Sequence, residues 1–252
     1  MILSPEDRER FDRHFRLPQV GESGQARLRK AKVLVVGAGG LGSPVLAYLA
    51  AAGIGELTVL DDDRVSLSNL QRQILHGTPD VGRSKVDSAG DRIHALDPAV
   101  AFHGHRVRLT TVNARDWVRA ADVVVNCADN FETRYALGDA AVREGVPMVH
   151  GAVHRFQGEV ALFPPDGPCY RCLHPVPPIP GTVASCDEAG VLGVLPGVIG
   201  CLQASETIKY LLKIGDPMSG RVVAVDLLAG SFHEMRLEAD PRCPFHGTGS
   251  GV

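Results

Sequence analysis

Between residues 31 and 150, short uninterrupted hydrophobic runs alternate with longer segments of mixed polarity. The run Lys32–Val36 (KVLVV) is aliphatic after its first residue, which is typical of a strand buried on both faces of a sheet. The segment 43–52 (SPVLAYLAAA) predicts a helix that ends at Gly53. By the same criteria, further strands are expected at 57–60, 123–127 and 147–150, helices at 84–96, 113–121 and 131–145, and an extended segment at 100–109. This alternation predicts an α/β fold with a doubly wound, mostly parallel, Rossmann-like sheet.

The pattern changes on both sides of this region. After residue 151 the strands expected at 158–163, 221–227 and 231–237 are not each preceded by a helix, which favours an antiparallel extension of the sheet. A buried helix is expected at 197–212, and the Pro- and Gly-rich segment 174–190 predicts a long functional or mobile loop. Residues 5–30 are strongly charged and predict one or two surface helices. We expect a single domain over residues 1–252, composed of N-terminal helices (1–30), a nucleotide-binding half (31–150) and a second half (151–252).

Composition excludes several classes of protein. The chain has 252 residues, of which 44% are hydrophobic and 22% charged, as in ordinary globular proteins. A net charge of -3 gives no electrostatic reason to expect nucleic acid or a membrane surface as partner. No apolar run is long enough to span a bilayer, and the charged N-terminus lacks the apolar segment of a signal peptide. We therefore expect a cytoplasmic protein, whose six cysteines are metal ligands, reactive thiols or core residues rather than disulfides.

A glycine-rich loop follows the first strand. Gly37, Gly39 and Gly42 form a GxGxxG motif between a predicted strand and a predicted helix, where backbone N–H groups can approach phosphate. Asp61 ends the next strand, where its carboxylate can accept hydrogen bonds from ribose hydroxyls. The neighbouring Asp62 and Asp63 are interpreted as a solvated strand end. The loop predicts nucleotide binding but does not distinguish NAD from ATP.

The segment after this loop resembles a known family. It contains DDDRVSLSNLQRQ at 61–73, then Lys85, then CADN at 127–130. With GAGGLGS at 37–43 and RFDR at 10–13, the chain resembles the ThiF/MoeB/HesA adenylyltransferases, bacterial relatives of the ubiquitin-activating enzymes, over nearly its whole length. The resemblance implies ATP-dependent adenylation of the C-terminal glycine carboxylate of a ubiquitin-like sulfur carrier of the ThiS/MoaD type. Pyrophosphate is released, and the carrier is prepared for thiocarboxylate formation.

The resemblance also implies which residues act. Arg72 and Lys85 are suited to neutralise phosphate oxygens, because the reaction brings a carboxylate to a shielded α-phosphate. Asp129, at the end of a parallel strand, can hold Mg²⁺, and Arg13 would reach the ATP site of the neighbouring subunit in a homodimer. Taken singly, these residues also suit surface charges or, for Asp129 and Asn130, a helix N-cap. The expected nucleotide contacts are Gly37, Gly39, Gly40, Gly42, Asp61, Ser68, Asn69, Leu70, Gln71, Arg72, Gln73, Lys85, Asp129 and Asn130.

Two short-spaced pairs of metal-ligand residues lie in the second half. Cys169 and Cys172 form one pair, Cys243 and His246 the other, and together they predict a closed tetrahedral zinc site. The family pattern has cysteine at all four positions, so His246 is a departure, although imidazole is an ordinary zinc ligand. The alternative is that the second pair belongs to a frayed tail.

The remaining cysteines and histidines have weaker signals. Cys186 aligns with a cysteine that some relatives use for covalent sulfur transfer and others keep without needing it. Because Asp187 and Glu188 follow it and would raise its pKa, we expect no catalytic role. Cys127 and Cys201 are expected in the core. Structural or surface positions are expected for the other histidines, including His76, His103, His105, His150 and His154.

Partners and rival functions remain open from the sequence. We expect the second half to bind the carrier and a separate protein, such as a cysteine desulfurase or a rhodanese, to donate sulfur; molybdopterin, thiamine and tRNA thiolation pathways all remain possible. A tRNA threonylcarbamoyladenosine dehydratase-like enzyme would also adenylate a carboxylate but would need a basic RNA-binding surface. An NAD-dependent oxidoreductase would explain the glycine loop yet leave Arg72, Lys85 and Asp129 without a purpose.

Overall fold

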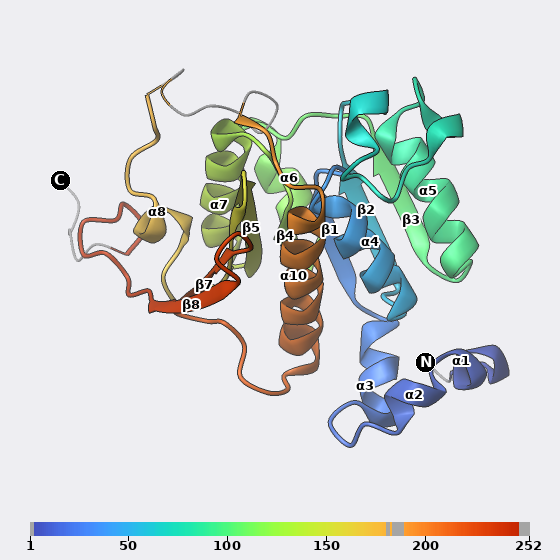
Figure 1. The fold of residues 1–252 in the computed structure, drawn as a ribbon. Coiled ribbons are helices and arrows are strands. Elements are labelled where there is room, and N and C mark those ends of the chain that lie inside the picture. Colours follow the sequence, from blue (N-terminus) through green and yellow to red (C-terminus); the bar gives the residue numbers. More distant parts are fainter. Residues whose placement is uncertain (1–2, 180–181, 183–188, 247–252) are drawn as a thin grey trace.

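A mixed sheet forms the centre of the protein (Figure 1). The computed structural model describes residues 3–179, 182 and 189–246. Within them the sheet has eight strands in the order β3-β2-β1-β4-β5-β6-β7-β8. The strands are β1 (Lys32–Val36), β2 (Glu56–Leu60), β3 (Ala101–His105), β4 (Val123–Asn126), β5 (Met148–His154), β6 (Gln157–Phe163), β7 (Arg221–Asp226) and β8 (Ser231–Arg236).

The sheet has a parallel part and an antiparallel part. Strands β3 to β5 pair in parallel, and β5 to β8 pair antiparallel. The chain runs outward from β1 to β3 and then returns to β4, which lies on the other side of β1. The loops that leave β1 and β4 therefore run in opposite directions, which opens a crevice at the carboxyl ends of these strands. The predicted parallel sheet with an antiparallel extension is confirmed.

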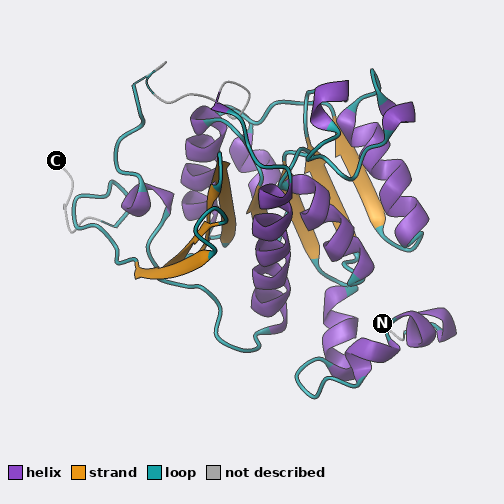
Figure 2. Cartoon of the chain, viewed as in Figure 1, coloured by secondary structure: helices purple, strands orange, loops and turns teal. Residues whose placement is uncertain are grey.

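Helices cover both faces of the sheet (Figure 2). In the central strand β1, Val33 and Val35 pack into the core beneath α4, α5 and α10, whereas Leu34 and Val36 pack into the core beneath α6 and α7. This two-sided burial explains why the strand is a continuous hydrophobic run. The described helices are α1 (Pro5–Arg10), α2 (Asp12–Phe15), α3 (Gly21–Leu28), α4 (Gly42–Ala51), α5 (Lys85–Leu96), α6 (Ala114–Val118), α7 (Phe131–Glu144), α8 (Tyr170–Leu173) and α10 (Val194–Leu212), with 3-10 helices η1 (Leu67–Asn69) and η2 (Thr78–Asp80).

Several elements differ from the prediction. The N-terminal segment forms three short helices rather than one or two. Strand β5 continues to His154, because β6 pairs with it along its whole length. The extended segment predicted at 100–109 is a strand only over Ala101–His105, and the single turn α8 was not predicted. Part of the predicted loop at 174–190 lies outside the described residues.

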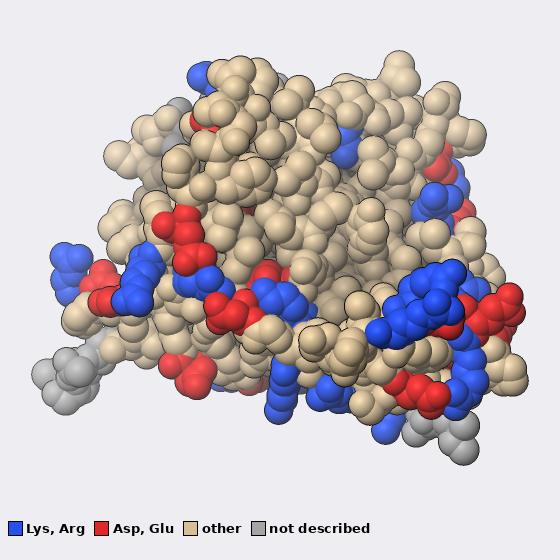
Figure 3. All heavy atoms as spheres, turned by 60° about the horizontal axis from the view of Figure 1, so that its bottom comes forward, with Lys and Arg blue, Asp and Glu red and all other residues tan. Residues whose placement is uncertain are grey.

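The surface carries charges of both signs. On the face drawn in Figure 3, basic and acidic side chains lie next to one another. Surface ion pairs such as that between Arg16 and Asp12 occur along the chain. Among the described residues, this face shows no broad basic surface. None of the described helices combines the length and the apolar character needed to cross a bilayer.

A buried ion cluster attaches the N-terminal helices to the rest of the protein. The Arg29 side chain is 3% exposed; its Nη2 lies 2.7 Å from Oδ1 of Asp7, and its Nη1 lies 2.7 Å from Oδ2 of Asp97. The first contact is a hydrogen bond, but the second is a close ion pair without hydrogen-bond alignment. The guanidinium also lies 4.8 Å from the centre of the Phe11 ring. Arg29 thus connects α1 and the chain around Phe11 to the end of α5.

Removing the cation of this cluster should destabilise the protein strongly. In Arg29→Leu, the carboxylates of Asp7 and Asp97 lose their shared partner inside the protein. Loss of one side of a buried ion pair typically costs about 3–5 kcal/mol. We expect a loss of this size in the free energy of unfolding, measured by urea denaturation. Arg8→Ala is the matched control, because Arg8 pairs with Glu22 at an exposed site and should change stability little. Equal stability of the two variants would contradict the prediction.

Candidate functional site

The glycine loop lies where β1 and β4 diverge. Gly37 has φ of +101°, and a Cβ placed on it would lie 2.7 Å from the carbonyl oxygen of Cys127. A Cβ on Gly42 would lie 2.0 Å from the carbonyl oxygen of Gly37. Both positions therefore exclude any side chain, and their glycines allow α4 to begin directly above the end of β4. The crevice therefore requires glycine at both of these loop positions.

Asp61 organises the backbone at the end of β2. Its Oδ2 accepts a hydrogen bond from the N–H of Ala38 at 2.7 Å, and its Oδ1 accepts one from the N–H of Asp63 at 2.9 Å. Burial raises the pKa of the Asp61 carboxyl, while nearby Lys85 and the two backbone donors oppose that rise. The side chain also lines the pocket at the crevice.

The two predicted phosphate cations are positioned by neighbouring polar groups. Lys85 is the first residue of α5, and its Nζ donates to Oδ2 of Asp63 at 2.8 Å while its side chain is 7% exposed. Asp63 is solvated as predicted, but the sequence did not reveal that it also positions Lys85. Arg72 Nη1 donates to the carbonyl oxygen of Ser68 at 3.1 Å. Both cations line the same pocket.

This pocket contains most of the predicted nucleotide contacts. Its lining includes Gly37, Gly39, Gly40, Asp61, Arg72, Gln73, Lys85, Asp129 and Asn130. Asn130 is also the N-cap of α7, since its side chain accepts from the N–H of Thr133 at 2.9 Å. The N-cap role and the pocket position are therefore compatible.

Other predicted contacts do not line this pocket. Among them, Asn69 accepts backbone hydrogen bonds from Arg72 at 3.0 Å and Gln73 at 2.9 Å, so the η1 turn positions the two residues that do line it. The predicted contacts outside the pocket lining are Gly42, Ser68, Asn69, Leu70 and Gln71. Arg13 lies on α2, pairs with Asp12 at 2.6 Å, and has a side chain that is 79% exposed. It does not line this chain's own pocket.

His76, expected at a structural or surface position, is a buried residue that supports the glycine loop. It is buried, and its Nε2 lies 2.9 Å from the carbonyl oxygen of Ala38, while its Nδ1 lies 2.9 Å from Oγ of Ser88. Because a carbonyl only accepts, Nε2 must carry the proton. Burial lowers the pKa of His76, which favours this neutral form. His76 therefore holds the carbonyl of Ala38 while Asp61 holds its N–H, which fixes the glycine loop.

A second cavity continues from the crevice. It has a volume of about 660 Å³ and shares Asp129, Asn130, Arg134 and Val153 with the first pocket. Its other lining residues lie on β5, β6, β7 and β8, apart from Phe131 of α7 and His174 after α8. The antiparallel strands thus form a groove that ends at the predicted nucleotide site.

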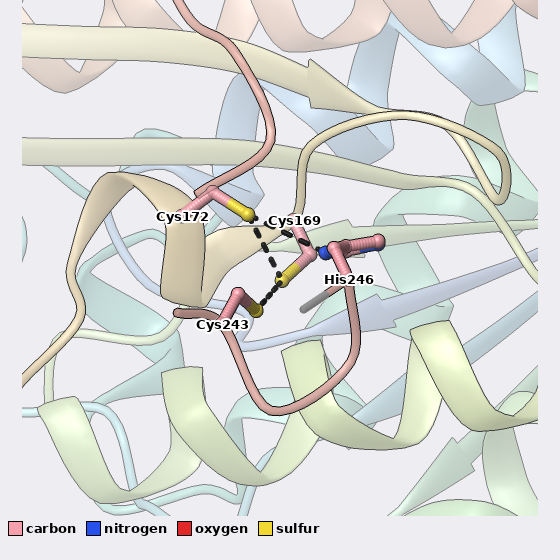
Figure 4. Close-up of side chains that lie close together, drawn as sticks. All are labelled: Cys169, Cys172, Cys243 and His246. Carbon is pink, nitrogen blue, oxygen red and sulfur yellow. Dashed lines mark hydrogen bonds between the residues drawn. The ribbon is translucent and has the colours of Figure 1, made fainter. Parts of the chain in front are cut away.

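The two predicted metal-ligand pairs meet in space (Figure 4). Sγ of Cys169 lies 3.8 Å from Sγ of Cys172 and 3.6 Å from Sγ of Cys243. Nδ1 of His246 lies 3.4 Å from Sγ of Cys172. These separations fit four ligands around a tetrahedral ion whose bonds are about 2.0–2.3 Å long. Burial raises the pKa of the Cys169 thiol to about 12, which disfavours a thiolate without a neighbouring cation.

The predictions for the other cysteines had different outcomes. Cys127 is buried, as predicted. The prediction that Cys201 lies in the core is wrong, since it is exposed on α10. Cys186 lies outside the described residues.

Comparison with known proteins supports an assignment to a family. Residues 11–245 match the ThiF family. A sulfur carrier protein adenylyltransferase of Thermus thermophilus is 51% identical over 253 residues, covering 98% of this chain and 93% of that protein. A SAMP-activating enzyme E1 of Haloferax volcanii is 47% identical over 241 residues, covering 96% of this chain and 89% of that protein.

Solved structures agree in fold. A crystal structure of E. coli MccB with MccA-N7isoASN aligns with a TM-score of 0.83 at 23% identity, covering 98% of this chain and 76% of that one. At this identity the likeness concerns the fold alone. The family match and the two relatives of about half identity extend over nearly the whole chain, and the chain belongs to the ThiF family.

Proposed function

We infer that the protein uses ATP to adenylate the C-terminal carboxylate of a ubiquitin-like sulfur-carrier protein. This conclusion rests on the observation that the pocket and the groove share part of their lining. A pocket with the glycine loop, Arg72 and Lys85 opens directly into a groove along the antiparallel strands. The Thermus and Haloferax relatives are named for activities of this kind.

The residues of the pocket suit the adenylation step. N–H groups of the glycine loop would contact the phosphates, and Asp61 would accept from the ribose. Arg72 and Lys85 would neutralise the α-phosphate oxygens as the carrier carboxylate attacks. Mg²⁺ held by Asp129 would supply charge stabilisation for the departing pyrophosphate. No proton acceptor is needed, because the nucleophile is already an anion.

The groove suits the tail of the carrier. A chain that ends in Gly-Gly has no bulky side chain near its terminus, so it can lie along a narrow groove and bring its carboxylate to Asp129 and Asn130. An oxidoreductase would have no use for cations and a peptide groove at this pocket. A tRNA-modifying enzyme would need a broad basic surface, and the net charge of -3 argues against one.

The cations of the pocket should be essential for activity. Lys85→Ala and Arg72→Ala should each lower carrier-dependent ATP–pyrophosphate exchange by roughly 10²–10³-fold, as expected when one preorganised charge donor is removed. Exchange is measured with a panel of carriers that end in Gly-Gly.

Matched controls are Lys32→Ala and Arg64→Ala, which remove cations that do not line the pocket. Both controls should exchange like the unmodified protein. Near-normal exchange in Lys85→Ala or Arg72→Ala would remove that residue from the mechanism. Absence of carrier-dependent exchange in the unmodified protein would reject the proposed function.

We also propose that Arg13 completes the site of a second subunit in a homodimer. Its exposed position, outside this chain's own pocket, supports a role in trans. Arg13→Ala and Asp129→Ala homodimers should both be inactive in exchange. After mixing and subunit exchange, mixed dimers should recover activity, because one of their two sites contains neither defect. No recovery, despite mixed dimers detected by mass spectrometry, would show that Arg13 does not act in trans.

We further propose that the Cys/His cluster holds a structural zinc ion. Purified protein should contain about one zinc per chain, and Cys169→Ser should lose both metal and stability. His246→Cys should keep the metal, because thiolate and imidazole are both ordinary zinc ligands. Cys201→Ser is the matched control, since this exposed cysteine lies outside the cluster and should leave zinc unchanged. The measurements are elemental analysis and thermal melting; metal-free protein of full stability would refute the proposal.

A further inference from the structure

The Glu159 side chain lies on the floor of the groove. Glu159 of β6 pairs with Ala152 of β5 on one side and with Ala224 of β7 on the other, and Ala224 pairs with His233 of β8. These four residues form one row across the sheet, and all of them line the groove. Because both immediate neighbours are alanines, the floor is hollow beside the Glu159 carboxylate, whose side chain is 26% exposed.

Two histidines bind the same oxygen of this carboxylate. Oε1 lies 3.2 Å from Nε2 of His150 and 3.3 Å from Nε2 of His174. Among the described residues, Oε2 has no hydrogen-bond partner. The carboxylate is therefore held in place through one oxygen and offers the other to the groove.

The contact between His150 and Asn126 determines which nitrogen of His150 donates to Glu159. The N–H of Ala128 donates to Oδ1 of Asn126 at 3.1 Å, so Nδ2 of Asn126 is the atom that faces Nδ1 of His150 at 3.0 Å. An amide nitrogen only donates, and Nδ1 of His150 must accept. Nε2 therefore carries the proton and donates it to Glu159. A metal ion on this nitrogen is incompatible with that tautomer, so the His150–Glu159–His174 cluster is a hydrogen-bond network and not a second metal site.

The carboxylate is held ionised. Burial tends to raise the pKa of Glu159, but hydrogen bonds from His150 and His174 outweigh it and place the pKa well below the usual range. Burial lowers the pKa of His150, whose side chain has no exposure, and this favours the neutral donor. The groove therefore presents an oriented anionic acceptor near neutral pH.

We propose that Oε2 of Glu159 accepts a hydrogen bond from a main-chain N–H of the carrier's C-terminal tail, which makes Glu159 a positioning residue for adenylation. The inference rests on the proposed function. A glycine tail has no side-chain donors, so its peptide N–H groups are the only donors it can offer. Arg134, which also lines the groove, is already engaged, because its Nε donates to the carbonyl oxygen of Ala128 at 3.0 Å. An acceptor at Glu159 would fix the depth at which the terminal carboxylate meets the nucleotide.

Glu159→Ala should weaken recognition of the carrier and leave recognition of ATP intact. We expect the KM for the carrier to rise roughly ten- to a hundredfold, the range for a hydrogen bond to a charged group, with an unchanged KM for ATP. In Glu159→Gln the single amide oxygen faces His150 and His174, so a donor NH2 group replaces Oε2, and this isosteric variant should raise the carrier KM about as much as Glu159→Ala. Glu234→Ala is the control, because Glu234 lies on the opposite face of β8, where it pairs with Arg221. Thermal melting of each variant separates loss of recognition from loss of fold.

Carriers with a single backbone ester provide the sharper test. Replacing one of the last four tail amides at a time by an ester removes one N–H and keeps the shape. At one position the ester should raise the KM of the unmodified enzyme as much as Glu159→Ala does, and it should have no further effect in the Glu159→Ala enzyme.

The outcomes separate the two proposals. If the unmodified enzyme exchanges pyrophosphate with the carrier but Glu159→Ala leaves the carrier KM unchanged, the inference is wrong and the proposed function stands. If every ester acts equally in both enzymes, Glu159 does not contact a tail N–H. If the unmodified enzyme shows no carrier-dependent exchange with any carrier tested, the proposed function fails first.

Discussion

The whole site depends on the close contact between the loop after β1 and the end of β4. Gly37 and the carbonyl of Cys127 approach so closely that a Cβ would lie 2.7 Å from the oxygen, and Gly42 allows no side chain against Gly37. This contact lets α4 begin over the crevice while the loop that leaves β4 turns the other way. The glycine loop therefore forms part of the pocket lining, beside the side chains of Arg72 and Lys85. Any side chain at Gly37 or Gly42 would push α4 away from the end of β4 and disrupt the pocket.

Hydrogen bonds hold charged residues and backbone groups in place around that contact. Asp63 holds Lys85, Asp61 holds the N–H of Ala38, and His76 holds the carbonyl of the same residue. The Asp61 and His76 links fix the glycine loop at Ala38, and the Asp63 link fixes Lys85, so these groups keep fixed positions before a ligand arrives. Such preorganisation is what phosphate chemistry requires, because the site does not have to reorient dipoles as charge develops.

Much of this was predictable from local sequence, and the exceptions have physical causes. Strand β1 was predicted with both of its ends, because two-sided burial produces an uninterrupted apolar run. Cys201 was misplaced because α10 is apolar over most of its length, and composition does not tell which side of the helix a residue faces. The roles of His76 and Glu159 depend on contacts between segments far apart in the chain, which no local pattern records. The clustering of Cys169, Cys172, Cys243 and His246 was predicted because each short-spaced pair suits one shared ion, and the ion itself stays a proposal.

The antiparallel strands give the second half a fixed position relative to the nucleotide pocket. Strand β5 pairs with β4 in parallel and with β6 antiparallel, so one strand belongs to both the pocket side and the groove side of the sheet. The hydrogen-bond chain from Asn126 through His150 to Glu159 crosses these same three strands. Strand register therefore sets the distance between the groove proposed for the carrier tail and the pocket proposed for the phosphates. A change in the pairing of β5 would displace the groove from the pocket even with every pocket residue intact, so under the proposed function one continuous sheet would align both substrates.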